Sequence, residues 1–293
     1  MARQNQAFLM GAVLKDPKIV KNPDGEYLYA MVYVTVVRGY REVGDGKKFM
    51  KADNPVIITR EKELIQEIER WQVYDIVDVK GPIASKNILK SSICAHCGEK
   101  NKATGSLVYI NPIYARRRLH LDNRDECVNY LSTNREISNQ VFVFGTLCRD
   151  PKKLTPKEGL IVTQYQVAMN RKFRIKQDPP ELKTDYPWVK SYGANAMEDH
   201  KRLHTGSIVY IDGCLQARSV LRHTQCEHCN EQYDWKDRAM EIVPYATEYI
   251  LNYYDDETIE ENEARRLEQI KRDIFLRDTQ KSDDDTLTDD NWM

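Results

Sequence analysis

Four of the seven cysteines stand in two pairs of the same spacing, Cys94-Ala-His-Cys97 and Cys226-Glu-His-Cys229. Two thiolates at this spacing can bind one edge of a tetrahedral zinc ion, which needs two further ligands. A zinc ribbon would supply a second pair about 15 to 20 residues later, and neither segment does so. Three interpretations stay open. The two pairs form one four-cysteine site, each pair acts alone with His96 or His228 or is a decayed ribbon, or the pairs form redox disulfides.

Both cysteine pairs belong to a long internal repeat. The stretch from Asn139 to Lys152 is an edited copy of the stretch from Asn5 to Lys18, and Lys183-Thr-Asp-Tyr-Pro187 likewise matches Lys51-Ala-Asp-Asn-Pro55. The spacing between matching residues shortens slightly along the chain, as small loop deletions would cause. A period this long indicates a duplicated domain rather than a solenoid, whose repeats have about 20 to 50 residues. The length of 293 residues suits two domains with a core each.

Each repeat contains the elements of a small barrel. In the first repeat, apolar and alternating patterns predict strands at 7–13, 27–36, 54–59, 76–85 and 106–114 and a helix at 61–71. In the second, they predict strands at 140–147, 160–170, 185–192, 207–219 and 239–246 and a helix at 195–203. Five strands with a helix between the third and the fourth is the order of the OB fold, which commonly binds oligonucleotides.

The sequence therefore predicts a mainly β protein with two tandem five-stranded OB-fold barrels, each with a short helix, a C-terminal helix and a disordered acidic tail. We expect the first OB domain over 1–120, a linker with a short helix over 121–138, the second OB domain over 139–254, a helical segment over 255–281 and the tail over 282–293. No apolar run approaches the roughly 18 residues of a membrane span, and no signal peptide is recognisable. We expect a cytoplasmic protein with no membrane partner.

Charge is distributed unevenly along the chain. The segment 255–293 carries 14 acidic and 6 basic side chains, whereas the segment 1–254 carries 31 acidic and 38 basic ones. A basic body is suited to binding a polyanion. A mildly basic body with a solubilising tail would explain the same distribution.

Aromatic side chains occupy strand faces where polar residues are usual. Along 27–36 the aliphatic face from Leu28 to Val36 is expected to enter the core, which leaves tyrosines on the other face. In the second repeat the aromatics lie on the third strand instead. Exposed aromatic rings along a strand are a surface on which bases stack; the alternative is that another element or subunit covers them. The residues predicted to contact DNA on these faces are the aromatics Tyr27, Tyr29, Tyr33, Tyr186, Trp188 and Tyr192, together with Lys190, which shares the face of the third strand.

A basic loop follows the second strand in each repeat, at 38–49 and at 171–183. The Lys and Arg side chains of such loops can contact the phosphates of a nucleic-acid backbone. Their predicted DNA-binding residues are Arg38, Tyr40, Arg41, Lys47 and Lys48 in the first repeat and Arg171, Lys172, Phe173 and Arg174 in the second.

Four stretches resemble signatures of bacterial single-stranded DNA-binding proteins: 139–145, 149–151, 167–174 and 206–218. The resemblance covers both repeats, more closely the second. It implies sequence-independent binding and protection of single-stranded DNA in replication, recombination or repair, of a chromosome, plasmid, phage or mobile element, without catalysis. The usual member has one such domain per chain and assembles four, which implies a homodimer here, and it lacks the Cys-x-x-Cys pairs.

Other functions compete with this one. An RNA-binding OB protein, or a non-catalytic adaptor that binds proteins through its aromatic faces, would share most of these features. An enzyme is not expected, because the sequence has neither a glycine-rich phosphate loop nor a paired-carboxylate motif.

The end of the chain resembles the acidic tip with which the same family recruits replication and repair enzymes. Asp289 and Asp290 precede the apolar Trp292 and Met293. The resemblance implies that these four residues bind partner proteins. The alternative is a solubilising tail that competes with DNA for the basic body.

Overall fold

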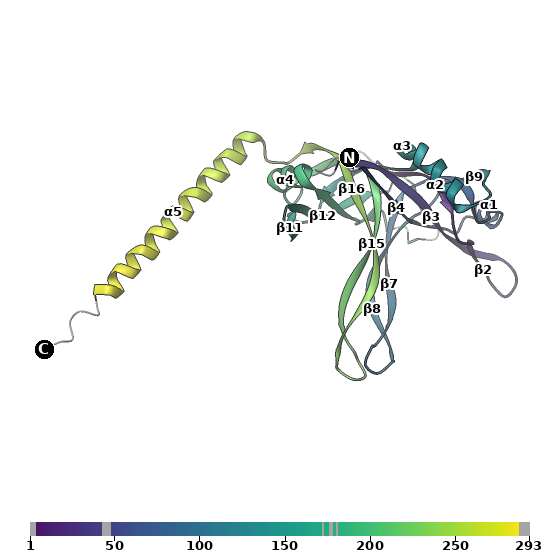
Figure 1. Ribbon diagram of the computed structural model, residues 1–293, viewed down its shortest axis with the longest axis horizontal. Coiled ribbons are helices and arrows are strands. Elements are labelled where there is room, and N and C mark those ends of the chain that lie inside the picture. Colours follow the sequence, from purple (N-terminus) through teal and green to yellow (C-terminus); the bar gives the residue numbers. More distant parts are fainter. Residues whose placement is uncertain (1–3, 43–47, 172, 176–177, 180, 287–293) are drawn as a thin grey trace.

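The computed structural model describes residues 4–42, 48–171, 173–175, 178–179 and 181–286, and for 39–42, 48–50 and 275–286 it describes the backbone alone. This part of the chain is mainly β with a long C-terminal helix, which confirms the predicted fold class (Figure 1). Within it, no helix combines the length and the apolar character that crossing a membrane requires.

Strands and helices follow the same order in the two repeats. The first repeat has β1 (Asn5–Val13), β2 (Lys18–Lys21), β3 (Tyr27–Glu42), β4 (Lys48–Asp53), β5 (Val56–Thr59), α1 (Lys62–Glu69), β6 (Asp75–Gly81), β7 (Ile83–Ile93), β8 (Lys100–Ile110) and β9 (Tyr114–His120). The second has β10 (Asn139–Leu147), β11 (Lys152–Lys157), β12 (Leu160–Asn170), β13 (Thr184–Asp185), β14 (Trp188–Tyr192), α4 (Gly193–Arg202), β15 (Ile208–Gln225) and β16 (Gln232–Leu251). Helices α2 (Arg124–Thr133) and α3 (Arg135–Ser138) connect the repeats, and α5 (Asp256–Thr286) ends the described chain.

The barrel cores come from the alternation along the second strand of each repeat. Ala30, Val32, Val34 and Val36 of β3 are buried as expected. The expectation for Leu28 is wrong, since its side chain is 47% exposed. It lies in β3 close to the turn that joins β2 and β3, and this hairpin extends outward from the barrel (Figure 1).

Each barrel closes through one parallel strand pair. In the first repeat Ile57 of β5 stands opposite Ile110 of β8, and in the second Val189 of β14 stands opposite Ile242 of β16. Both pairs are fully buried, and they are equivalent when Pro55 is aligned with Pro187. The closures therefore have the same geometry in the two repeats.

A pseudo-twofold axis relates the repeats. Strands β1 and β10 pair antiparallel, with Ala7 opposite Val141 and Asn5 opposite Val143. Because Ala7 and Val141 are equivalent when the two copies are aligned, the axis passes between them. Strands β6 and β9 extend this sheet on one side, and β15 and β16 extend it on the other. The barrels thus share a sheet and a continuous core.

The asparagine that begins each repeat has the same role in both. The Asn5 side chain donates to Ile83 O and accepts from Ile83 N, both at 2.9 Å. Asn139 makes the same two bonds with Leu215, at 2.8 and 2.9 Å. Each side chain therefore satisfies one backbone donor and one acceptor at a point where buried polar groups need partners.

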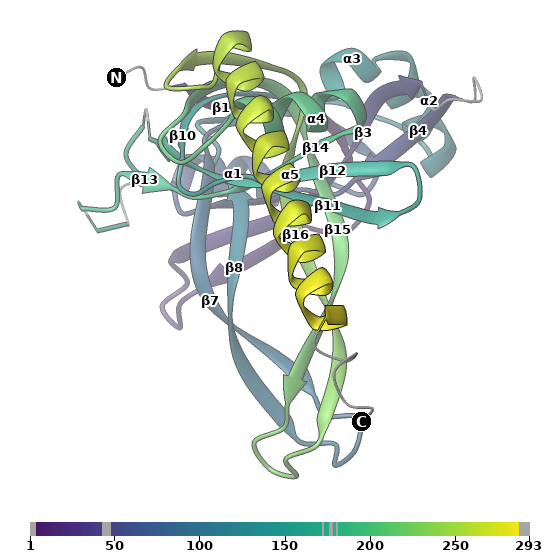
Figure 2. The ribbon, with the colours of Figure 1, turned by 90° about the vertical axis from the view of Figure 1, so that its left-hand side faces the viewer.

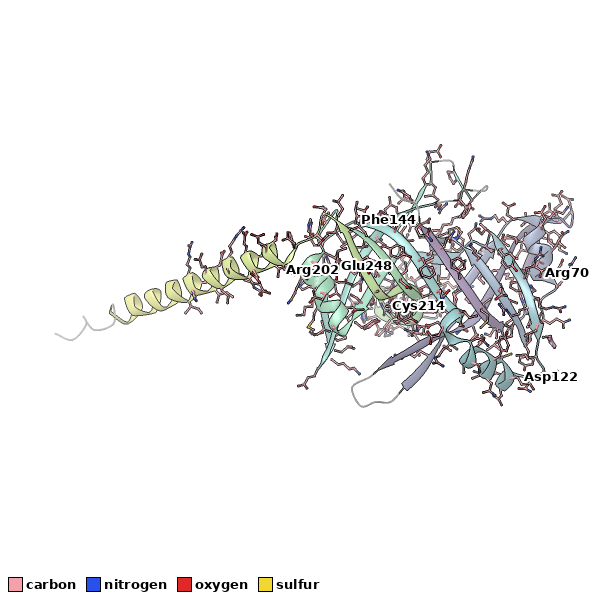
Figure 3. All side chains as sticks on the ribbon, turned by 90° about the horizontal axis from the view of Figure 1, so that it is seen from above. Arg70, Asp122, Phe144, Arg202, Cys214 and Glu248 are labelled. Carbon is pink, nitrogen blue, oxygen red and sulfur yellow. The ribbon has the colours of Figure 1, made fainter. Side chains whose placement is uncertain are left out.

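Two hairpins and one helix leave the shared body. The β7–β8 hairpin and the distal part of β15–β16 run side by side away from the barrels (Figures 1 and 2). Helix α5 departs from the second repeat in another direction. In the view from above, Arg202 lies near the start of α5, Phe144 lies further along the body, and Asp122, which follows β9, lies at the opposite end (Figure 3).

Candidate nucleic-acid interface and cysteine cluster

The two cysteine pairs meet at the tips of the paired hairpins. Cys94 Sγ lies 3.7 Å from Cys229 Sγ, and Cys97 Sγ lies 3.6 Å from Cys226 Sγ. All four sulfur atoms lie within 4.8 Å of one another, and all four cysteines are free thiols. This geometry agrees with the first of the three interpretations, a joint four-cysteine cluster, and the pseudo-twofold axis explains why the pairs converge.

The turn that presents each pair has the same backbone bonds. Gly98 N donates to Cys94 O, and Asn230 N donates to Cys226 O, both at 3.0 Å. Gly98 and Asn230 have φ angles of 76° and 59°, in the left-handed region that glycine and asparagine tolerate best. The sequence thus provides at both tips the residue type that this tight turn needs.

Hydrogen bonds at the cluster favour a thiolate. The backbone around Cys229 and His228, together with the Asn101 amide, donates toward Cys226 and lowers the pKa of its thiol to about 6. The Asn101 Nδ2 to Cys226 Sγ distance is 3.3 Å. Backbone hydrogen bonds at Glu99 and Glu231 act to lower the pKa of Cys97 and Cys229, but burial and the neighbouring thiols outweigh them and raise it. The hydrogen bonds therefore favour the thiolate at one of the four cysteines, and a thiolate is the form that binds metal.

The hairpins are joined along their length as well as at the tips. Lys90 Nζ lies 2.7 Å from Asp237 Oδ1, and the hydroxyls of Ser92 and Tyr233 are 2.7 Å apart. Ser92 and Tyr233 are both buried. Contacts along their length therefore hold together the two hairpins that carry the four thiols.

A reciprocal contact connects the body of each repeat to the hairpin of the other. Asp185 Oδ1 accepts from Ser85 N at 2.7 Å, and Asp53 Oδ1 accepts from Ala217 N at 2.8 Å. Asp185 is fully buried and Asp53 nearly so. The two aspartates are equivalent in the aligned repeats, and so are Ser85 and Ala217. We call these four residues and the arginines paired with them the inter-repeat clasp.

The clasp arginines are Arg38 and Arg171. Arg171 makes a bidentate pair with Asp185, at 2.6 and 2.8 Å, and a third contact with Asp178 at 2.7 Å. Arg38 Nε lies 2.5 Å from Asp53 Oδ2. The Arg171 side chain is 3% exposed and the Arg38 side chain 11%. Each arginine thus faces a buried carboxylate, and Arg38 Nη1 also donates to Gln216 Oε1 at 2.8 Å. Their predicted phosphate contacts stay a prediction.

Lys190 is placed in a similar way. It is buried, its Nζ lies 3.4 Å from Glu241 Oε1, and burial lowers its pKa. Its predicted role at the DNA surface likewise stays a prediction. Arg218 shares the same Glu241 carboxylate in a bidentate pair.

The predicted aromatics are exposed to different degrees. Tyr186 is 49% exposed and Tyr33 38%, whereas Tyr29, Trp188 and Tyr192 are half-buried. Tyr27 is half-buried, and its hydroxyl bonds to Glu69. Tyr33, Tyr186 and Trp188 therefore offer ring surface in both repeats.

Two arginines that the sequence pattern does not single out lie over these rings. The Arg149 guanidinium is 5.4 Å from the centre of the Trp188 ring, and that of Arg238 is 5.0 Å from the centre of the Tyr33 ring. A cation beside an aromatic platform suits a polyanion with stacking bases. Arg149 stands in a repeated Asp-Pro motif, which is a signal that could identify it; nothing in the pattern around Arg238 does so.

Part of the outward face of the first repeat is covered. Ile175 from the basic loop of the second repeat is buried against Val56, Ala84 and Tyr109. The alternative of coverage by another element therefore holds for this part of the face. In the same loop Phe173 is half-buried and Arg174 is exposed.

The remaining predicted residues fall where side chains are not described. Lys47, Lys172, Asp289, Asp290, Trp292 and Met293 lie outside the described residues, and Tyr40, Arg41 and Lys48 are described by their backbone only, in β3 and β4.

The match to a known family concerns the second repeat. The family described as "Single-strand binding protein family" matches residues 138–234. The match covers about a third of the chain. The resemblance predicted from the sequence is thereby confirmed for the second repeat, and the matched segment contains β14 with its aromatics and the second cysteine pair.

Individual relatives agree with the family. Single-stranded DNA-binding protein 1 of Staphylococcus aureus (strain MSSA476) is 32% identical over 81 residues, which are 28% of this chain and 51% of that protein. The single-stranded DNA-binding protein of Staphylococcus epidermidis (strain ATCC 12228 / FDA PCI 1200) is 27% identical over 95 residues, which are 32% and 70%. The chain thus spans about half the length of the first of these relatives.

The structural similarity extends over both repeats. The wild-type single-stranded DNA binding protein from Thermus aquaticus superposes with a TM-score of 0.55 at 16% identity, over 87% of this chain and 97% of that one. A deletion mutant of that protein gives 0.54 at 18% identity, over 88% and 100%. At these identities the similarity concerns the fold.

Proposed function

We propose that the protein binds single-stranded DNA without sequence preference and protects it during replication, recombination or repair, without catalysis. The observation that carries the proposal is the set of partly exposed rings with adjacent arginines, Tyr33 with Arg238 and Trp188 with Arg149, on a fold shared with single-stranded DNA-binding proteins. Stacking on aromatic rings is sequence-tolerant, because every base has a π-face.

A titration against three polymers tests this function. We expect oligo(dT) to bind much more tightly than duplex DNA or RNA of equal length. The logarithm of the association constant should fall with the logarithm of the salt concentration, with a slope of about −0.7 per phosphate neutralised. Preference for RNA would support the RNA-binding alternative, and weak binding without salt dependence would support the adaptor.

Trp188→Ala should weaken oligo(dT) binding by about 1 to 3 kcal/mol, the range of one lost base–aromatic stack. The loss should be the same for different base sequences. Tyr253→Ala is the matched control, since Tyr253 is 39% exposed and follows β16 in the segment that leads to α5. Equal affinities of the Trp188 variant and the parent would show that β14 is not part of the DNA surface.

We also propose that the cysteine cluster binds one zinc ion per chain. A tetrahedral site with zinc–sulfur bonds of about 2.3 Å has sulfur–sulfur edges of about 3.8 Å. The two cross-hairpin distances are 3.7 and 3.6 Å. Four neighbouring thiolates repel one another, and a divalent cation offsets that repulsion. Zinc here would have a structural role, because four protein ligands leave no open position.

The assembly we propose is a homodimer. The family that this chain resembles assembles four OB domains, and two chains with two domains each would supply four. The pseudo-twofold sheet offers a self-complementary surface of the kind that a twofold interface needs. Phe8 and Phe142 meet across its centre with ring centroids 5.9 Å apart, and a hollow of about 290 Å³ lies beside Phe8. Sedimentation equilibrium should give twice the chain mass of 34.3 kDa; a monomer at micromolar concentration would refute the dimer.

The acidic tip is proposed to bind replication or repair proteins. The aromatic and apolar end would enter a small basic-edged pocket, while the two aspartates attract it over a distance. Deleting Asn291–Met293 removes this anchor and keeps every acidic side chain. We expect unchanged or slightly tighter DNA binding and loss of partner capture in a pull-down with purified helicase, nuclease or primase from the same cell. Undiminished capture would leave the solubilising-tail alternative.

A further inference from the structure

A pocket of about 190 Å³ lies where the first barrel meets the hairpin of the second repeat. Its walls come from both repeats: Tyr33, Asn54, Val56, Lys90, Ser106, Leu107 and Val108 from the first, and Ala217, Asp237, Arg238 and Met240 from the second. The volume is below the roughly 300 Å³ at which pockets for drug-sized ligands begin. It therefore suits a single planar ring better than a complete nucleotide.

The pocket is open because the first repeat has small side chains at two positions. When Pro55 is aligned with Pro187, Asn54 corresponds to Tyr186 and Val56 corresponds to Trp188. The second repeat thus carries two large rings where the first leaves space. This difference between otherwise equivalent strands leaves space beside Asn54 and Val56, which both line the pocket.

The pocket combines a ring, a cation and an apolar wall. The Tyr33 ring is partly exposed, with the Arg238 guanidinium 5.0 Å from its centre. Arg238 Nη2 also donates to Asn54 O at 2.7 Å, which holds the guanidinium at the rim. Val56, Leu107 and Met240 supply the apolar surface.

The one carboxylate in the pocket is neutralised. Asp237 accepts from Lys90 at 2.7 Å and from Arg222 at 3.2 Å, and it is almost completely buried. Burial alone would raise the pKa of Asp237, but these partners outweigh it and hold that pKa below its usual value. The pocket therefore presents net positive charge to a ligand that arrives on a phosphate chain.

We propose that this pocket takes up one nucleobase of bound single-stranded DNA, which stacks on Tyr33 while Arg238 contacts an adjacent phosphate. The inference rests on the proposed function and adds a composite subsite that neither repeat forms alone. The two repeats then bind bases differently, the second on the surface of β14 and the first inside a pocket.

Photocrosslinking of an oligo(dT) that carries 5-iododeoxyuridine tests the subsite, with the adducts mapped by mass spectrometry. In the parent protein we expect adducts at Tyr33 and at Trp188. Val56→Trp fills the pocket with the side chain found in the second repeat, so the Tyr33 adduct should fall at least about fivefold, the lower limit for one lost stack. The Trp188 adduct should persist, which makes it an internal control.

A second variant guards against misfolding of Val56→Trp, because Val56 is buried. Asn54→Tyr places the other ring of the second repeat at the rim and should also reduce the Tyr33 adduct. A parent protein with the Trp188 adduct and none at Tyr33 would overturn the pocket and leave the proposed function intact. A Tyr33 adduct undiminished in a folded filled variant would do the same. Failure of the parent to bind oligo(dT) would instead refute the proposed function.

Discussion

Cys226→Ser should release all of the zinc that we propose the cysteine cluster binds, and Cys94→Ser should do the same. The two residues come from different hairpins, yet their sulfur atoms belong to one group within 4.8 Å. Removal of one of four ligands opens a closed structural site and lowers its affinity severely. Two independent sites would each hold metal, so a single substitution would release only half.

Metal analysis by mass spectrometry after gel filtration measures this result, with about one zinc per chain expected for the parent. Cys148→Ser is the matched control, because Cys148 is an exposed thiol far from the hairpin tips in the sequence. Retention of half the zinc in either variant would contradict a shared site. A parent without zinc, purified in the absence of chelators, would contradict metal binding altogether.

The sequence could predict the cysteine cluster only as one of three alternatives. Spacing within a pair defines half a site, but whether two half-sites meet depends on the relation between the repeats. That relation comes from the antiparallel β1–β10 pairing around Ala7 and Val141, and the pairing register of two equivalent strands is not visible in either strand alone. Once the axis is known, convergence of the two tips follows.

The basic loops show what charge counting leaves open. Their position after a strand in a basic stretch predicts phosphate binding for Arg38 and Arg171, and the structure places both in the inter-repeat clasp. A signal is available, since both arginines and both clasp aspartates recur in the two repeats. Each arginine begins a basic loop, and its aspartate follows at the end of that loop. Pattern alone does not tell a repeated ion pair from a repeated binding surface, because burial decides between them.

Duplication within one chain frees equivalent positions to diverge. In a homodimer of single domains, a change at one position appears on both sides of the axis. Here Val56 and Trp188 occupy equivalent sites with different side chains, and so do Tyr33 and Gln166. The clasp and the cysteine pairs stay equivalent, since each must meet its counterpart across the axis. The stacking residues need no counterpart, which explains why divergence is found there.

Asp185→Ala should lower the free energy of unfolding by about 3 to 5 kcal/mol, the usual cost of breaking a buried ion pair by removing one partner. The substitution leaves Arg171, whose side chain is 3% exposed, with only Asp178 as a charged partner. It also leaves Ser85 N without the acceptor that joins the second repeat to the first hairpin. The loss of the ion pair and the loss of this hydrogen bond both lower the free energy of unfolding.

Guanidinium denaturation followed by circular dichroism provides the measurement. Glu198→Ala is the control, because both side chains of the Glu198–Arg202 pair on α4 are partly exposed to solvent and the pair should contribute less than about 1 kcal/mol. Asp53→Ala tests the equivalent half of the clasp, and we expect a smaller loss there, since Arg38 approaches Asp53 through one ion-pair contact.

A double variant tests whether Arg171 and Asp185 act as one unit. Arg171→Ala with Asp185→Ala should cost less than the sum of the single substitutions, because the loss of their shared ion pair is counted once. The loss that persists in the double variant comes from the unpaired Ser85 N–H and from the buried Asp178 carboxylate, which no longer has Arg171 as its partner. If Asp185→Ala proves no less stable than Glu198→Ala, the clasp does not hold the repeats together, and the shared β1–β10 sheet and the contacts between the paired hairpins must do so.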